Sequence, residues 1–305
     1  MDSENRTRVE GAMARKIKEK IAVYSELTLF PFVIFTLPFA LTGGMLAQWT
    51  INGQFIPPVN KIFWIILAVF SARNAGMAVN RFLDKDIDRE NPRTEQRALV
   101  KGIIGNKEVI IFTVFSLALF VLSALMLNPL CLYLSPVPVV LILVYSSAKR
   151  WTWMNHFVLG SILFWAPVGG WIAVKGTWGS PAVIMGIAVF FWTSGFDIIY
   201  DREDVAFYRA RGLHSIPALL GEKWSQVIAF LLHVVTVYLL LYLGGEYDFG
   251  NIYYFGILNL AVLVIFGHIT TYKTEVLRTN KTFFWINSLT SGGFLFITLS
   301  DLIVR

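Results

Sequence analysis

Two groups of polar residues have the types and the spacing that could bind a divalent metal ion. The first acidic motif is Asn80, Asp84 and Asp88, and the second acidic motif is Asp197, Asp201 and Asp204. The spacings are i, i+4, i+8 and i, i+4, i+7, so a helix would place each motif along one face. Carboxylates held close together repel one another unless a cation lies between them. Such oxygen ligands favour Mg²⁺, which commonly uses one or two carboxylates together with substrate phosphate oxygens. The motifs therefore predict Mg²⁺ that holds a phosphate group.

A solvated helix end is the simpler alternative for each motif taken alone. Lys85, Arg89 and Arg202 lie close enough in sequence to neutralise the acidic side chains. Two matching one-faced motifs in one chain are harder to explain in this way, and we therefore favour metal binding.

Basic residues near the motifs favour a phosphate-bearing ligand. Arg93 and Arg97 are spaced i, i+4 directly after the first motif, although an ordinary excess of positive charge in cytoplasmic loops would also explain them. Arg73 lies about two helical turns before Asn80, deep in an apolar segment, where an arginine should face an interior cavity. Further candidates, at the end of another apolar segment, are Tyr145, Lys149 and Arg150.

The composition is that of a membrane protein. Of the 305 residues, 56% are hydrophobic and only 15% are charged, and the mean hydropathy is +0.61. A membrane-spanning helix needs about 20 mostly apolar residues. We expect nine such spans, at 27–49, 62–80, 109–127, 130–148, 156–174, 181–200, 225–243, 251–272 and 283–303.

Positively charged residues are distributed unequally between the two sides of these spans. Most of the 26 Lys and Arg residues fall in the N-terminal arm, 1–26, and in the loops that follow even-numbered spans, whereas only Lys61, Lys175 and Arg305 fall on the opposite side. The positive-inside rule then predicts an integral protein of the cytoplasmic (inner) membrane, with the N-terminus and both acidic motifs in the cytoplasm and the C-terminus outside. Residues 27–305 would form a single transmembrane domain, and this distribution of charge does not favour a nucleic acid partner.

The two halves of the chain are similar in plan. Each acidic motif ends an even-numbered span, four spans apart, and each is followed by a short apolar step that ends in glycine, RALVKG and SIPALLG. We infer an all-α fold of two four-helix pseudo-repeats plus one helix around a central cavity, with cytoplasmic cap loops. The four histidines, His156, His214, His233 and His268, offer no close pair in sequence, and the single Cys131 cannot form an internal disulfide.

These residues resemble the UbiA superfamily of intramembrane prenyltransferases. The family pattern is N-x-x-x-D-x-x-x-D followed by D-x-x-x-D-x-x-D, and the two acidic motifs match both parts. The first part often reads N-D in the family, whereas here it reads Asn80-Arg81. The strings RNAGMAVNR, NPRTEQRAL and GLHSIPALLG are most similar to the quinone-pathway branch, which prenylates 4-hydroxybenzoate or a related aromatic acid.

The resemblance implies Mg²⁺-dependent transfer of a polyprenyl group from polyprenyl diphosphate to a small aromatic acid, beside membrane lipid and without an obligate protein partner. It implies that both acidic motifs hold the metal and diphosphate, with Asp84, Asp88, Asp197 and Asp201 as catalytic residues. By the same resemblance, Arg73, Arg93, Arg97 and Lys149 would contact diphosphate oxygens, Tyr145 would line the site, and Arg150 would bind the acceptor's carboxylate.

Three alternatives remain open. The same chemistry could use another acceptor, such as dihydroxynaphthoate, a porphyrin, chlorophyllide or a glycerol phosphate. A secondary transporter also uses intramembrane carboxylates, but near the midplane rather than at helix ends. A scaffold protein would give no reason for two metal-binding motifs.

Overall fold

The computed structural model describes residues 33–273 and 276–305, and within these ranges every regular element is helical. The expected N-terminal arm, 1–26, lies outside the described residues. The helices are α2 (Val33–Asn52), α3 (Val59–Leu83), α4 (Lys85–Glu90), α5 (Asn106–Leu127), α6 (Pro129–Leu134), α7 (Pro136–Ala148), α8 (Asn155–Lys175), α9 (Ser180–Tyr200), the 3₁₀ helix η2 (Asp201–Asp204), α10 (Val205–Arg211), α11 (Ile216–Glu246), α12 (Asn251–Lys273) and α13 (Val276–Val304).

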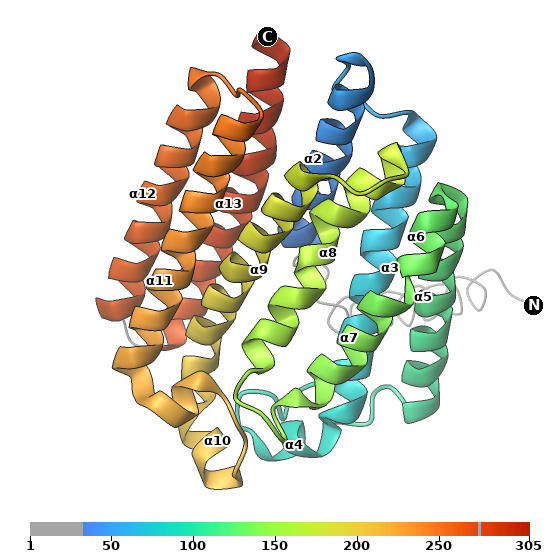
Figure 1. Ribbon diagram of the computed structural model, residues 1–305. Coiled ribbons are helices and arrows are strands. Elements are labelled where there is room, and N and C mark those ends of the chain that lie inside the picture. Colours follow the sequence, from blue (N-terminus) through green and yellow to red (C-terminus); the bar gives the residue numbers. More distant parts are fainter. Residues whose placement is uncertain (1–32, 274–275) are drawn as a thin grey trace, which may run out of the picture.

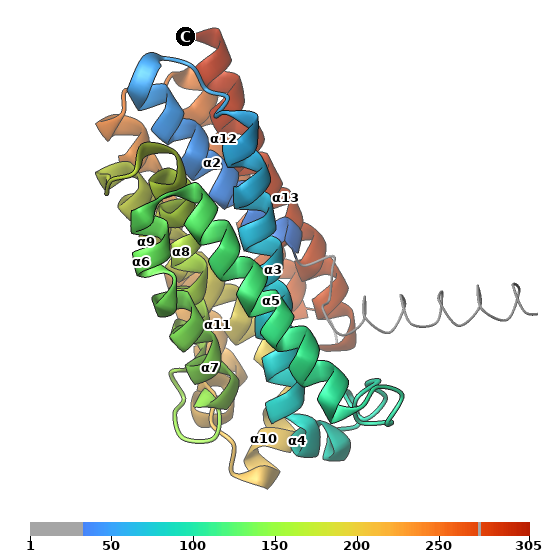
Figure 2. The same cartoon turned by 90° about the vertical axis from the view of Figure 1, so that its right-hand side faces the viewer.

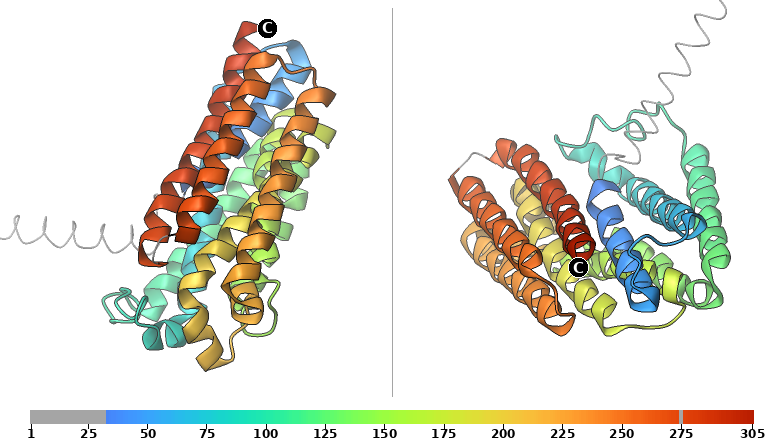
Figure 3. Two further views of the ribbon diagram at one scale, coloured as in Figure 1. Left: turned by 90° about the vertical axis from the view of Figure 1, so that its left-hand side faces the viewer. Right: turned by 90° about the horizontal axis from the view of Figure 1, so that it is seen from above.

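The prediction of nine membrane spans is confirmed for the described part of the chain. Nine helical segments there are long and apolar enough to cross a membrane, with α6 and α7 together making one of them. The long helices run side by side in one bundle, and α4 and α10 lie together at the end opposite the C-terminus (Figures 1 and 2). Seen from above, α11, α12 and α13 form one side of the bundle and α3 and α5 the other, with α2, α8 and α9 between them (Figure 3).

Two spans are interrupted, although their hydropathy predicts continuous helices. The fourth span is divided at Ser135 into α6 and α7, because Pro136 begins α7 and has no N–H to continue the hydrogen-bond ladder. The seventh span begins nine residues before the expected 225, at Ile216, and contains a break at Gly221, whose φ of 79° lies in the left-handed region. Hydropathy detects apolar length and does not detect either interruption.

Helices α2 and α8 cross in direct backbone contact at the centre of the bundle. A Cβ atom added to Gly43 would lie 2.1 Å from the carbonyl oxygen of Pro167, and one added to Gly170 would lie 1.9 Å from that of Ala40. Small residues allow this close approach between helices in a membrane. Large buried side chains such as Trp171 fill the core next to the crossing. The crossing thus forms a rigid wall beside the cavity described below.

Candidate functional site

Both acidic motifs line one cavity of about 430 Å³ at the end of the bundle where α4 and α10 lie. The motifs come from the C-terminal ends of α3 and α9, which are separated by more than 100 residues in sequence. All six motif residues line the cavity: Asn80, Asp84, Asp88, Asp197, Asp201 and Asp204. The expected meeting of two distant motifs around one space is therefore present in the fold.

The first motif follows a helix that is briefly interrupted. Helix α3 ends at Leu83, Asp84 takes φ −89° and ψ 2°, and α4 begins at the next residue. The backbone N–H of Asp84 still donates to the carbonyl of Asn80 (2.9 Å), and that of Asp88 donates to the carbonyl of Asp84 (2.7 Å). This i to i+4 pattern keeps the three side chains on one face, as their spacing predicts. The side-chain amide of Asn80 donates to Oδ2 of Asp84 (3.0 Å).

The second motif occupies a tighter turn. Asp197 lies in the last turn of α9, and the chain then continues as the 3₁₀ helix η2 from Asp201 to Asp204. Fewer residues per turn bring the third motif residue round to the cavity at i+7. Oδ1 of Asp204 accepts hydrogen bonds from the side chains of Asn91 (2.9 Å) and Arg93 (3.1 Å), both in the loop after α4. This loop therefore joins the two motifs directly.

The basic residues that the sequence singles out pair with the motif carboxylates. Lys149 lies 2.6 Å from Oδ2 of Asp84, and Arg150 lies 3.0 Å from its Oδ1. The remaining pairs are Arg97 with Asp88 and Arg93 with Asp204. The three paired carboxylates are at most 4% exposed, and buried charges require such partners. Burial lowers the pKa of Arg93, but the carboxylate of Asp204 more than offsets this and raises the pKa above its ordinary value.

Asp201 differs from the paired aspartates. Its Oδ2 atom is buried and has no hydrogen-bond partner among the described residues. A buried carboxylate oxygen without a partner is destabilising, unless a cation or a donor from a ligand completes it. A metal ion bound at Asp201 would thus supply a partner for the buried Oδ2 atom, which lacks one in the ligand-free site.

The available ligands suit Mg²⁺ whose shell is completed by substrate oxygens. They suit less well a metal ion that is bound by protein side chains alone. In the described part of the chain, no three His, Cys, Asp or Glu side chains converge closely enough to form a complete metal site. Mg²⁺ characteristically takes one or two carboxylates and completes its shell with water and substrate phosphates. Carboxylates on opposite sides of a cavity, with basic residues between them, suit a metal ion that arrives with a phosphate ligand.

The rest of the cavity is an apolar tunnel that continues along the bundle to its opposite end. It is lined at that end by Ile65, Leu127, Cys131 and Ile172. Lining residues on α8 extend from Asn155 to Ile172, which at 1.5 Å per residue corresponds to about 25 Å. Near this end the side-chain amide of Asn128 donates to the carbonyl of Ile172 (2.7 Å).

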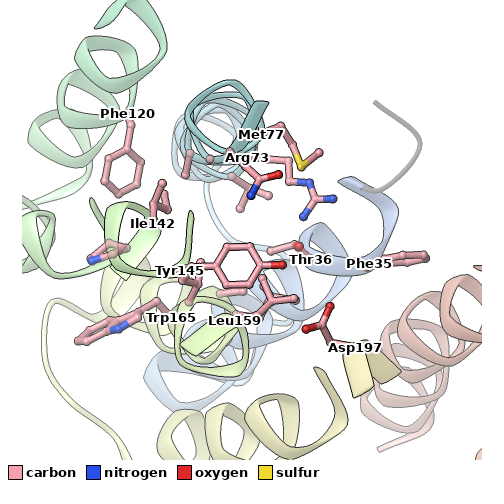
Figure 4. A pocket seen from close by; sticks show the side chains of 18 of the residues that line it. Phe35, Thr36, Arg73, Met77, Phe120, Ile142, Tyr145, Leu159, Trp165 and Asp197 are labelled. Atoms are coloured by element: carbon pink, nitrogen blue, oxygen red, sulfur yellow. The ribbon is translucent and has the colours of Figure 1, made fainter. Parts of the chain in front are cut away.

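Arg73 and Tyr145 lie where the charged and apolar parts of the cavity meet. Figure 4 shows both side chains and Asp197 around the cavity, with Phe120 and Ile142 on the side away from Asp197. Both predicted residues line the cavity, as do Arg93, Arg97 and Lys149.

Arg150 is not among the described residues that line the cavity. Its guanidinium instead donates to Asp84 and to the backbone carbonyls of Leu83 (2.6 Å) and Ser146 (3.0 Å). These contacts join the end of α3 to the end of α7. Binding of an acceptor carboxylate by Arg150 stays a prediction.

Three site residues were not found by reasoning from the sequence. Asn91 holds Asp204, and His156 contacts Asp197 at 2.8 Å. Arg81, which occupies the position where the family pattern often has an acidic residue, lines the cavity and is 7% exposed. Asn91 was detectable as a polar residue three positions after the first motif, whereas no spacing in the sequence connects His156 with a motif 41 residues later.

A charged chamber continued by an apolar tunnel, inside a bundle of membrane-spanning helices, defines an integral membrane enzyme for a ligand with a charged head and an apolar tail. The chain belongs to the UbiA prenyltransferase family, whose model matches residues 27–289. It is a polyprenyltransferase, and its similarity to the quinone-pathway branch is confirmed by the relatives described next.

Two curated relatives share about a third of their residues with the chain. It is 32% identical to the 4-hydroxybenzoate octaprenyltransferase of Vibrio campbellii over 233 residues, which cover 73% of this chain and 81% of the relative. It is 30% identical to the protein of that name from Aliivibrio fischeri over 267 residues, which cover 85% and 91% respectively.

Solved structures support the same fold. The apo structure of a UbiA homologue from Aeropyrum pernix K1 matches with a TM-score of 0.76 and 32% identity, and the match covers 90% of this chain and 97% of the homologue. A UbiA homologue from Archaeoglobus fulgidus bound to DMAPP and Mg²⁺ matches with a TM-score of 0.69 and 18% identity, covering 92% and 99%. At that identity the second match is evidence of the shared fold alone.

Proposed function

We propose that the enzyme transfers a polyprenyl group from polyprenyl diphosphate to 4-hydroxybenzoate or a related aromatic acid in quinone biosynthesis, with Mg²⁺ as cofactor. The observation that carries this proposal is the single cavity, about 25 Å long, that joins both acidic motifs to an apolar tunnel. The charged chamber suits a diphosphate, and the tunnel suits an isoprenoid tail. The names of the Vibrio and Aliivibrio relatives support the choice of acceptor.

Both acidic motifs, Asn80, Asp84, Asp88, Asp197, Asp201 and Asp204, would hold Mg²⁺ and through it the diphosphate. Bound Mg²⁺ would supply positive charge that stabilises the departing diphosphate. In the ligand-free chain each of Arg93, Arg97 and Lys149 contacts a motif carboxylate. When the substrate binds, each of these basic side chains would exchange its carboxylate for a diphosphate oxygen, and Arg73 would contact the same group from the tunnel side.

Breaking the allylic C–O bond leaves the electron pair on the diphosphate and a positive charge on the prenyl carbon. The cavity wall beside the motifs contains Phe196, Tyr200 and Tyr208, whose ring faces can stabilise a cation. The enclosing helices keep water from this carbon, which would otherwise form the alcohol. The ring carbon ortho to the acceptor hydroxyl then forms the new C–C bond, and loss of its proton restores the aromatic ring.

The test is an assay with purified full-length protein in detergent, supplied with a polyprenyl diphosphate, Mg²⁺ and one acceptor at a time. We expect release of diphosphate and a prenylated product with 4-hydroxybenzoate, and no product in the presence of a chelator. Dihydroxynaphthoate, a porphyrin, chlorophyllide and a glycerol phosphate would be the competing acceptors, and preference for one of them would replace the proposed acceptor. No diphosphate release with any acceptor would contradict prenyl transfer altogether.

A further inference from the structure

His156 lies in the first turn of α8 and is fully buried beside the second acidic motif. Its Nδ1 atom is 2.8 Å from Oδ2 of Asp197, and its Nε2 atom is 3.8 Å from Oδ2 of Asp201. The hydroxyl of Ser194 donates to the backbone carbonyl of His156 (3.3 Å). The imidazole is therefore fixed between α8 and α9, in contact with a residue that we assign to metal binding.

The backbone of α11 determines which nitrogen of His156 carries the proton. The N–H of Ile216, the first residue of α11, donates to Nε2 at 3.3 Å. With Nε2 accepting this hydrogen bond, the ring proton lies on Nδ1. Nδ1–H consequently donates to Asp197. Since Ile216 is 2% exposed, water has little access to its N–H and does not compete with Nε2 for this hydrogen bond.

Asp197 is thus held differently from the other partnered motif aspartates. Asp84, Asp88 and Asp204 each contact a lysine or arginine, and such a cation competes with a metal ion for the carboxylate. Oδ2 of Asp197 instead contacts the Nδ1 atom of the His156 imidazole, which leaves Oδ1 as the oxygen for a ligand. The side chain of Asp197 keeps 16% exposure, toward the cavity that it lines.

We propose that His156 is a positioning residue that orients Asp197 for metal binding through its Nδ1–H, with its tautomer set by the backbone of Ile216. This inference rests on the proposed function, because it assumes that Asp197 holds the metal ion. Hydrogen bonds to ligating groups typically contribute a factor of about 10 to 100 in metal affinity. The magnitude is large enough to measure by direct binding, apart from catalysis.

Two substitutions separate the two hydrogen bonds of the imidazole. In His156→Asn the amide N–H can occupy the place of Nδ1–H and donate to Asp197, but the acceptor for Ile216 is lost. In His156→Gln the longer side chain brings an amide oxygen near the place of Nε2, where it accepts from Ile216, but it offers no donor to Asp197. The variants are similar in polarity and differ in which bond they keep.

The experiment measures binding of Mn²⁺, in the presence of inorganic pyrophosphate, to full-length protein in detergent by electron paramagnetic resonance. We expect His156→Gln to weaken Mn²⁺ binding about 10- to 100-fold and His156→Asn to stay within a few-fold of the wild type. If the Gln variant is not monodisperse, His156→Ala, which removes both bonds, takes its place. An Asp197→Asn background should abolish the difference between the variants.

The possible outcomes are distinct. Equal weakening by the Asn and Gln substitutions, or wild-type affinity in both, would overturn the positioning role. Absence of Mn²⁺ binding by the wild-type protein would instead contradict the proposed metal site itself.

Discussion

Asp201 has a buried carboxylate oxygen without a hydrogen-bond partner in the described part of the chain. Replacement of this residue is the sharpest test of the site. In Asp201→Asn and in Asp84→Asn the side-chain size is kept and the negative charge is lost. We expect kcat to fall about 100- to 1,000-fold, as for the removal of one preorganised electrostatic group. In Asp201→Asn the thermal unfolding midpoint should not fall, because the substitution removes an uncompensated buried charge.

A matched control lies within the same segment of sequence. Asp86 stands between Asp84 and Asp88, but its side chain is 88% exposed, and within the described residues its ion pair is with Arg89. Asp86→Asn should therefore leave kcat within about two-fold, in keeping with the small contribution of exposed ion pairs. Full activity in both Asp84→Asn and Asp201→Asn would show that the motifs take no part in catalysis.

Arg150 gives a second prediction at the scale of single residues. Because its guanidinium holds Asp84 and the ends of α3 and α7, we expect Arg150→Ala to raise the KM for polyprenyl diphosphate and the Mg²⁺ concentration needed for half-maximal rate. Both the KM and the required Mg²⁺ concentration should rise about 10-fold, as for the loss of a charge-assisted hydrogen bond. Steady-state kinetics with each substrate varied in turn measures the effect, and Arg89→Ala is the exposed control.

A selective rise in the KM for the aromatic acid would contradict this prediction for Arg150. That result would support the role expected from the sequence, in which Arg150 binds the acceptor's carboxylate. It would also mean that the guanidinium leaves Asp84 when substrate binds.

The sequence predicts the members of the site better than it predicts their partners. Type and spacing identify the two motifs, because helical geometry converts a spacing of four residues into one face. Lys149 was recognised as a basic candidate, but its pairing with Asp84 depends on contact between α7 and α3, which no local pattern contains. His156 was missed for the same reason, since its contacts with Asp197 and Ile216 exist only in the folded bundle.

At the scale of elements, hydropathy predicts the long helices but not the irregular points that shape the site. The spacing of the first motif predicts one helical face and gives no sign of a break, yet α3 ends at Leu83 and the chain resumes as α4. The second motif passes into a 3₁₀ helix, which its i, i+4, i+7 spacing does not distinguish from an α-helix. Both deviations are small, and each keeps its motif directed at the cavity.

The tunnel between these helices predicts a limit on the length of the isoprenoid tail. Cys131 lines the end of the tunnel far from the motifs, so Cys131→Trp would shorten the space available to the tail. We expect kcat/KM for octaprenyl diphosphate to fall about 5- to 150-fold, the range that corresponds to overpacking by about 1–3 kcal/mol. Activity with geranyl diphosphate, whose short tail does not reach this end, should be unchanged.

Cys131→Ala is the control, since it removes the thiol without filling the tunnel. An equal loss with both substrates in Cys131→Trp would indicate a general disturbance of the fold. Unchanged activity with octaprenyl diphosphate would show that the tail leaves the cavity sideways between helices before it reaches α6.

At the scale of the whole molecule, the bundle has two chemically different ends. Both acidic motifs, the loop of Arg93 and Arg97, and helices α4 and α10 lie at one end, and the C-terminus lies at the other (Figure 1). Most of the lysines and arginines between the spans fall at the first end. The positive-inside rule predicts that this end lies in the cytoplasm, where a water-soluble aromatic acid would be available to the site.

Labelling of introduced cysteines tests this orientation in intact cells. With Cys131→Ala as background, Lys101→Cys would mark the exposed loop at the acidic end, and Trp178→Cys would mark the loop between α8 and α9 at the opposite end, where Trp178 is 49% exposed. We expect a membrane-impermeant maleimide to label Trp178→Cys in intact cells and Lys101→Cys only after permeabilisation. The reverse pattern would place both acidic motifs outside the cell, and the proposed substrates would then have to reach the enzyme from that side.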